Sequence, residues 1–173
     1  MAITNKPTIE NECVNGLRNI SERRAATIAL MIEEAKELGL DEGFARRAIY
    51  RYGIPMGKDF YNMLEDPTDI KELALYFGKD HNWDIYEMET VASTEDKLYI
   101  DFHYCPYVAQ WLKMGIPEDE IAELCDITME GDRAIGDCFP AINFTLGKTI
   151  AQGHTVCQLR FDKVKVEESE QKE

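Results

Sequence analysis

The sequence predicts one α+β domain, in which a helical N-terminal segment is followed by strand pairs on either side of further helices. Three observations predict this class. Apolar residues recur at helical spacing in the first half of the chain, alternate between residues 85 and 103, and alternate again near its end. The 173 residues, 45% of them hydrophobic, suit one compact domain. We therefore expect a single domain over residues 1–163, built on an antiparallel four-stranded sheet packed against helices, and a disordered acidic tail over residues 164–173.

The helical lead-in spans residues 18–79. A capping-box sequence at Asn19 predicts the start of its first helix, which Gly39 ends. Asp41 can cap a second helix, and the Gly-Ile-Pro sequence from Gly53 is expected to end it. After a connection rich in proline and glycine, a third and shorter helix follows.

The sheet and its helices occupy residues 83–163. Alternation over residues 85–91 and 98–103 predicts two strands joined by a turn. In the second strand, one apolar and one polar set would point to opposite faces of the sheet: Leu98, Ile100 and Phe102 against Tyr99, Asp101 and His103.

The middle of the chain predicts helices that begin at Pro106, at Pro117 and near residue 128. The helix from Pro117 is expected to end near Cys125, and the helices together should cover one face of the sheet. Residues 141–148 and 155–163 read as the second pair of strands.

Composition excludes several classes of function. The chain carries 33 acidic and 19 basic residues, a net charge of −14, which disfavours nucleic acid and anionic membrane as partners. No motif for ATP or NAD is present, and the most apolar stretch is too short to span a bilayer. The absence of a signal sequence and the odd number of cysteines, five, favour a cytoplasmic protein with free thiols. A small-molecule partner fits best, and apolar surface on the N-terminal helices could support a homo-oligomer.

Cys105 is the first candidate for chemistry, because it lies between a strand and a helix that starts at Pro106. The positive end of the helix dipole lowers a thiol pKa there and favours the nucleophilic thiolate. His103, two residues earlier, could carry protons. The alternative is a buried cysteine that only packs.

Other candidate residues come from separate elements. Cys125, Cys157 and His154 could converge with Cys105 on one side of the sheet. That allows a cysteine hydrolase with a histidine proton carrier, or a soft-metal site of thiolate and imidazole ligands. We predict no cofactor, since metal-ligand spacings are missing, while a soft metal stays open.

Charged and aromatic residues could bind a ligand. Asp126 and Asp132 could supply carboxylates, although a helix cap also explains Asp126 and an exposed helix face is the default interpretation of Asp132. Tyr107 belongs to an aromatic set that could line a cavity or pack a core. Arg133, Lys148 and Arg160 are candidates to bind a carboxylate.

The run from Cys105 to Gly115, then Leu124-Cys125-Asp126, then the run from Phe144 to Phe161 resemble the L-2-amino-thiazoline-4-carboxylic acid hydrolase family. The resemblance is strongest over residues 102–161. It implies hydrolytic opening of a small cyclic amidine that carries a carboxylate, with a carbamoyl-cysteine product.

Resemblance and residues together suggest a mechanism. Cys105 is the expected nucleophile, and His103 or His154 the proton carrier. Asp126 or Asp132 would bind the amidinium, and Arg133 or Arg160 the substrate carboxylate. The layout also loosely resembles the 4-vinyl reductase domain, so a non-catalytic module that binds a small molecule or a metal is the alternative.

Overall fold

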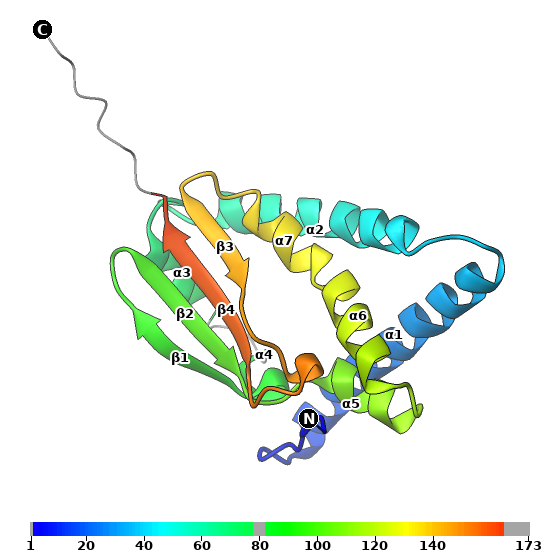
Figure 1. Ribbon diagram of the computed structural model, residues 1–173. Helices are drawn as coiled ribbons and strands as arrows, with labels where there is room; N and C mark the ends of the chain where they lie inside the picture. Colours follow the sequence, from blue (N-terminus) through cyan, green and yellow to red (C-terminus); the bar gives the residue numbers. More distant parts are fainter. Residues whose placement is uncertain (1, 78–81, 165–173) are drawn as a thin grey trace, which may run out of the picture.

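The computed structural model describes residues 2–77 and 82–164, and its α+β architecture agrees with the fold class predicted from sequence (Figure 1). The predicted tail, apart from Val164, lies outside the described residues. In the described part of the chain, no helix combines the length and apolar character that crossing a membrane requires. The elements in chain order are α1 (Glu12–Glu37), α2 (Gly43–Met63), α3 (Ile70–Phe77), α4 (Asn82–Tyr86), β1 (Met88–Ser93), β2 (Lys97–Phe102), α5 (Pro106–Lys113), α6 (Glu118–Thr128), α7 (Glu130–Gly136), β3 (Ile142–Leu146), the 3₁₀ turn η1 (Ile150–Gln152) and β4 (Cys157–Lys163).

The four strands form one antiparallel sheet in the order β1-β2-β4-β3. Leu98 and Ile100 of β2 are fully buried, and Leu159 and Phe161 of β4 join them on the inner face. The outer face carries polar groups such as the Tyr99 hydroxyl, which donates to Asp162 Oδ1 at 2.9 Å. The predicted assignment of β2 side chains to two faces is thus correct.

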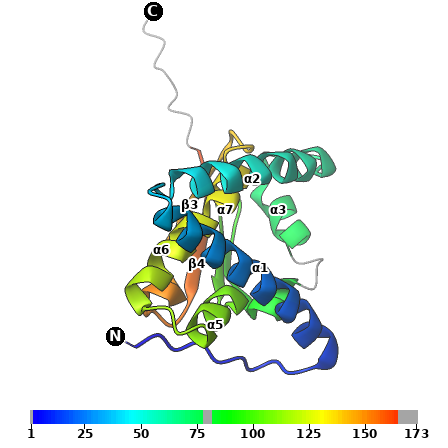
Figure 2. The ribbon, with the colours of Figure 1, turned by 90° about the vertical axis from the view of Figure 1, so that its right-hand side faces the viewer.

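The helix layer differs from the prediction. It is α3, from the lead-in, that contacts β1, β2 and β4, whereas α7 contacts the edge strand β3. Two of the middle helices pack mainly on the lead-in, α5 against α1 and α7 against α2, while α6 packs on the η1 turn, α5 and α2. In Figure 1, α1 and α2 form a V beside the sheet with α6 and α7 between its arms, and in Figure 2 α5 lies below α1, on the side away from α2. The Trp111 Nε1–H donates to Ala25 O at 3.1 Å and ties α5 to α1.

The first helix starts earlier than predicted. Asn11 is its N-cap, and its Oδ1 accepts the Val14 amide at 2.8 Å. The helix therefore passes through Asn19 without a break. Burial of Val14 and Arg18 stabilises the added turns, since a helix end is set by packing as well as by its cap.

The second helix continues past the predicted end at Gly53 and includes Pro55. Gly53 and Gly57 are buried against α7, where a Cβ on Gly53 would collide with the Gly131 carbonyl and one on Gly57 would lie 2.8 Å from Cys138 Sγ. These glycines allow close packing of two helices and do not end one. Pro55 lies on the exposed side of the helix.

Two further boundaries differ from the prediction. Residues 85–87, expected to begin a strand, belong to the end of α4 and to Glu87, whose φ of 49° breaks the extended chain. Glu87 is buried and holds the N-terminal segment, so tertiary contacts override the alternating pattern. Helix α6 runs on to Thr128 because Cys125 points into the core and does not end the helix.

Candidate functional site

Cys105 lies where β2 has ended and α5 begins, as the sequence predicts. It is the N-cap residue of α5, half-buried, with extended backbone angles and no side-chain capping hydrogen bond. Burial raises the pKa of its thiol to about 11, and the amides of Tyr107 and Val108 counteract this only in part. The expected lowering of the pKa was therefore wrong, because desolvation outweighs the helix dipole.

The structure brings Cys125 and Cys157 within electrostatic range of Cys105. Burial raises the pKa of both thiols, that of Cys157 to about 12. Cys157 Sγ accepts the Ile150 amide at 3.3 Å, and Cys125 interacts with the Thr149 side chain. Both residues therefore hold the η1 turn against the core. No group of three His, Cys, Asp or Glu side chains in the described ranges is placed to hold a metal ion.

Asp132 of α7 is the carboxyl within electrostatic range of the Cys105 thiol. Burial raises its pKa to about 6, against the opposing effects of its own amide and of Arg24 and Arg133. No other side chain among the described residues donates to it or pairs with it, yet it keeps some accessible surface. A desolvated carboxylate without a partner is costly to the fold, and such groups concentrate at functional sites.

Three more side chains extend this group, and sequence reasoning missed two of them. Tyr107, which was predicted, has its pKa raised to about 12 by burial, with Cys105 and Asp132 adding to the rise. Tyr86 of α4 is influenced by the same two groups. Arg24 of α1 lowers the pKa values of both tyrosines and of Asp132, and its guanidinium stacks 4.8 Å from the Tyr52 ring. No carboxylate of the described chain pairs with Arg24.

The described contacts of the two histidines lie away from the Cys105 thiol. His103 is exposed, and its Nε2 lies 2.9 Å from Glu89 Oε2 beside the outer face of the sheet. His154 follows Gly153, whose φ is 82°, and its amide donates to Thr149 O at 3.2 Å. Two residues of separation would place His103 and Cys105 on one face of a continuous strand, but β2 ends at Phe102 and Cys105 already caps α5.

Arg160 is also committed elsewhere. It donates to Asp101 Oδ1 at 2.6 Å and stacks 5.0 Å from the Tyr99 ring on the outer face of the sheet. Lys148, at the far end of β3, is exposed.

Asp126 and Arg133 belong to a surface ion-pair network. Arg133 pairs with Asp126 and donates to Glu130 at 2.8 Å, and Arg46 of α2 donates to Asp126 at 2.7 Å. Burial alone would raise the pKa of Asp126, but the two guanidinium groups lower it. Asp126 thus has partners that Asp132 lacks.

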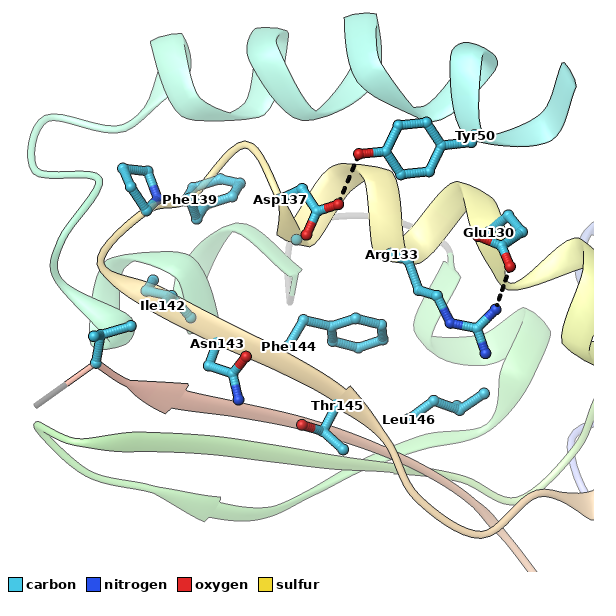
Figure 3. Close-up of a pocket in the computed structure, with 13 residues that line it drawn as sticks. Tyr50, Glu130, Arg133, Asp137, Phe139, Ile142, Asn143, Phe144, Thr145 and Leu146 are labelled. Atoms are coloured by element: carbon cyan, nitrogen blue, oxygen red, sulfur yellow. Dashed lines mark hydrogen bonds and ion pairs between the residues drawn. The ribbon is translucent and has the colours of Figure 1, made fainter. Parts of the chain in front are cut away.

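Arg133 faces a groove of about 670 Å³ between α7 and β3 (Figure 3). Apolar residues of β3, including Phe144 and Leu146, form one wall, and Tyr50 closes the other by donating to Asp137 at 2.7 Å. Arg133 pairs with Glu130, and Asp137 accepts from the neutral Tyr50 hydroxyl, so within the described residues this groove offers no unpaired cation to a substrate carboxylate.

Fold and site define a small α+β protein in which a half-buried thiol and a half-buried carboxyl, the latter without a side-chain partner among the described residues, lie near the start of α5 and in α7. The family model of L-2-amino-thiazoline-4-carboxylic acid hydrolase matches residues 18–161, and the chain belongs to this family. None of the curated proteins matches it.

A solved structure shares the fold. The crystal structure of a trafficking protein particle complex subunit 3 from Naegleria fowleri, covalently bound to palmitic acid, superposes with a TM-score of 0.54. The match covers 86% of this chain and 97% of that chain at 15% identity. At this identity the similarity concerns the fold alone.

Proposed function

We propose that the protein hydrolyses a small cyclic amidine such as L-2-amino-thiazoline-4-carboxylate to a carbamoyl-cysteine, at a site formed by Cys105, Asp132 and Arg24. Membership of the family supports the substrate class. The observation that carries the assignment to this site is the Asp132 carboxyl. It is buried enough for its pKa to rise, it keeps some accessible surface, and it has no side-chain partner among the described residues.

Recognition of the substrate follows from charge. A 2-aminothiazoline is cationic at its amidine and anionic at its carboxylate. Asp132 is mostly ionised at neutral pH, since its pKa is about 6, and binds the amidinium with charge-assisted hydrogen bonds. Arg24, also free of ion pairs within the described residues, binds the carboxylate in place of the predicted Arg133 and Arg160.

Binding of the amidinium also activates the thiol. With a pKa of about 11, Cys105 is protonated at neutral pH in the free protein. A bound cation next to the sulfur stabilises the thiolate and offsets part of the desolvation. Asp132 can then accept the thiol proton, a role predicted from the sequence for His103 or His154.

The reaction proceeds in two steps that together consume one water. The Cys105 thiolate adds to the amidine carbon, the ring C–S bond breaks, and the departing sulfur takes the proton that Asp132 received. This leaves an isothiouronium on Cys105. Water then adds to the same carbon and gives up a proton, the C–S bond to Cys105 breaks, and the thiol regains a proton as the carbamoyl product leaves.

The test is hydrolysis of L-2-amino-thiazoline-4-carboxylate, followed by mass spectrometry of the product and by appearance of its free thiol. The Cys105→Ala variant should lose turnover while remaining folded, and Cys13→Ala, at an exposed cysteine of α1, should keep it. Elemental analysis of the same samples tests for a bound metal. Equal turnover by Cys105→Ala and wild type would remove the nucleophile from the mechanism.

One observation favours a second candidate function. The high pKa of the Cys105 thiol makes it a weak nucleophile in the free protein, as expected for a non-catalytic module that only binds a ligand. The protein of shared fold is covalently bound to palmitic acid, and the 4-vinyl reductase domain, which the layout resembles, is a ligand-binding module. A binding module predicts saturable binding of the aminothiazoline to the wild type without any product.

A further inference from the structure

The N-terminal segment, residues 2–11, passes directly over the backbone of Cys105. The Cys105 amide donates to Asn5 Oδ1 at 2.9 Å, and Asn5 Nδ2 donates to Cys105 O at 2.8 Å. One carboxamide thus pairs with both polar groups of the Cys105 backbone, as a neighbouring strand would do, and the Cys105 carbonyl also accepts the Ala109 amide of α5 at 3.0 Å. The two residues are 100 positions apart in the sequence, so no local pattern indicates the contact.

Asn5 continues a series of backbone hydrogen bonds after β2 ends. The His103 amide donates to Glu87 O and the Tyr104 amide to Tyr86 O, both at 3.1 Å. No backbone acceptor among the described residues follows for the Cys105 amide, and Asn5 takes that place. The next residue, Pro106, has no amide hydrogen to donate. Asn5 therefore holds the last amide before α5 begins.

The segment that carries Asn5 is itself anchored on both sides. The Ile3 amide donates to Glu118 Oε1 at 3.0 Å on one side. On the other side, the amides of Thr8 and Ile9 donate to Glu87 Oε1 at 2.7 and 2.8 Å. Glu87 is only 6% exposed and is paired at 2.9 Å with Arg18, which is 3% exposed. This buried pair fixes the path of the segment, and hence the place of Asn5.

We propose that Asn5 is a positioning residue for Cys105: its carboxamide fixes the backbone that carries the thiol at the start of α5. The catalytic role of Cys105 rests on the proposed function, but the positioning itself does not. Cys105 makes no side-chain capping hydrogen bond with α5, and the Asn5 carboxamide holds its backbone from the other side. Preorganisation of this kind contributes to rate because small displacements of a reacting group are costly.

The experiment compares Asn5→Ala with Asn11→Ala. Asn11 is a matched control, because it lies on the same segment and caps α1 through one bond to Val14, away from Cys105. Both variants should lose stability to a similar extent, because each removes side-chain hydrogen bonds of one asparagine to backbone groups. Iodoacetamide labelling of the Cys105 peptide is followed by mass spectrometry from pH 7 to 11, which reads the thiol without any substrate.

We expect Asn5→Ala to change the labelling rate of Cys105 at pH 8 by about threefold or more and to move the midpoint of its pH profile downwards, because a looser backbone admits water to the thiol. Asn11→Ala should match the wild type. If the wild type also hydrolyses the aminothiazoline, Asn5→Ala should lower kcat about tenfold with little change in KM. Identical labelling profiles of Asn5→Ala and Asn11→Ala would overturn the proposal, whereas absence of turnover in the wild type would sink only the proposed function.

Discussion

Replacing Asp132 by Asn should stabilise the fold at neutral pH while abolishing hydrolysis. In the folded protein, burial raises the pKa of this carboxyl from 3.8 to about 6. The folded state therefore binds the proton more tightly than the unfolded state does. Above pH 6 the ionised carboxyl lowers the free energy of unfolding, and this penalty fades as the pH falls from 6 to about 4.

The gain in the free energy of unfolding follows from the raised pKa of Asp132. A pKa that rises from 3.8 to about 6 corresponds to about 3 kcal/mol, at about 1.36 kcal/mol for each tenfold change in proton affinity. Because the side chain keeps accessible surface, solvent screening reduces the expected gain to about 1–2 kcal/mol at pH 7.5. Near pH 4, where the native carboxyl is protonated, the uncharged amide of the Asp132→Asn variant would resemble it, and the two proteins should be equally stable.

Urea unfolding of wild type and Asp132→Asn at pH 4, 5.5 and 7.5 measures this difference. Asp126→Asn is the control with the opposite sign: its carboxyl is paired with Arg133 and Arg46, so it stabilises the fold at neutral pH and loses that contribution as the pH falls. If Asp132→Asn were less stable than wild type at pH 7.5, or if the difference did not vary with pH, Asp132 would be paired in the folded protein. The site built on it would then be refuted.

Three other predictions follow from the contacts. Arg24→Gln should raise KM about tenfold or more with little change in kcat, because it removes only binding of the substrate carboxylate. Steady-state kinetics measure both constants, and a fall in kcat alone would contradict the binding role of Arg24. Arg18→Met should lower the free energy of unfolding by about 3–5 kcal/mol in urea titrations, since it leaves Glu87 buried without its cation. A loss below about 1 kcal/mol would mean that the Arg18–Glu87 pair is solvated. His103→Ala should leave the pH profile of turnover unchanged, because the imidazole lies with Glu89 beside the outer face of the sheet; a changed profile would return it to the site.

The sequence predicted the fold class because hydrophobic periodicity reports which face of an element is buried. It placed β2, β4 and the start of α5 to within two residues, where alternation or Pro106 gives a local signal. It failed where distant residues decide the outcome. Gly53 read as a helix end because its contact with Gly131 of α7 is invisible along the chain.

The candidate site was predicted in part for the same reason. Cys105 could be found because a strand and a helix meet there. Arg24 could not, because nothing in an amphipathic helix marks which exposed arginine will face a distant carboxyl. Asp132 was named as a candidate, but the sequence favoured an exposed helix face for it, and only its burial and its lack of partners among the described residues separate it from Asp126.

The proposed opening of a cyclic amidine through Asp132 and Cys105 is tested by the rate at which purified wild type and Asp132→Asn convert L-2-amino-thiazoline-4-carboxylate to carbamoyl-cysteine at pH 7.5. We expect turnover by the wild type and a loss of at least about 100-fold in the variant. No product from the wild type, or equal rates in the two proteins, would contradict it.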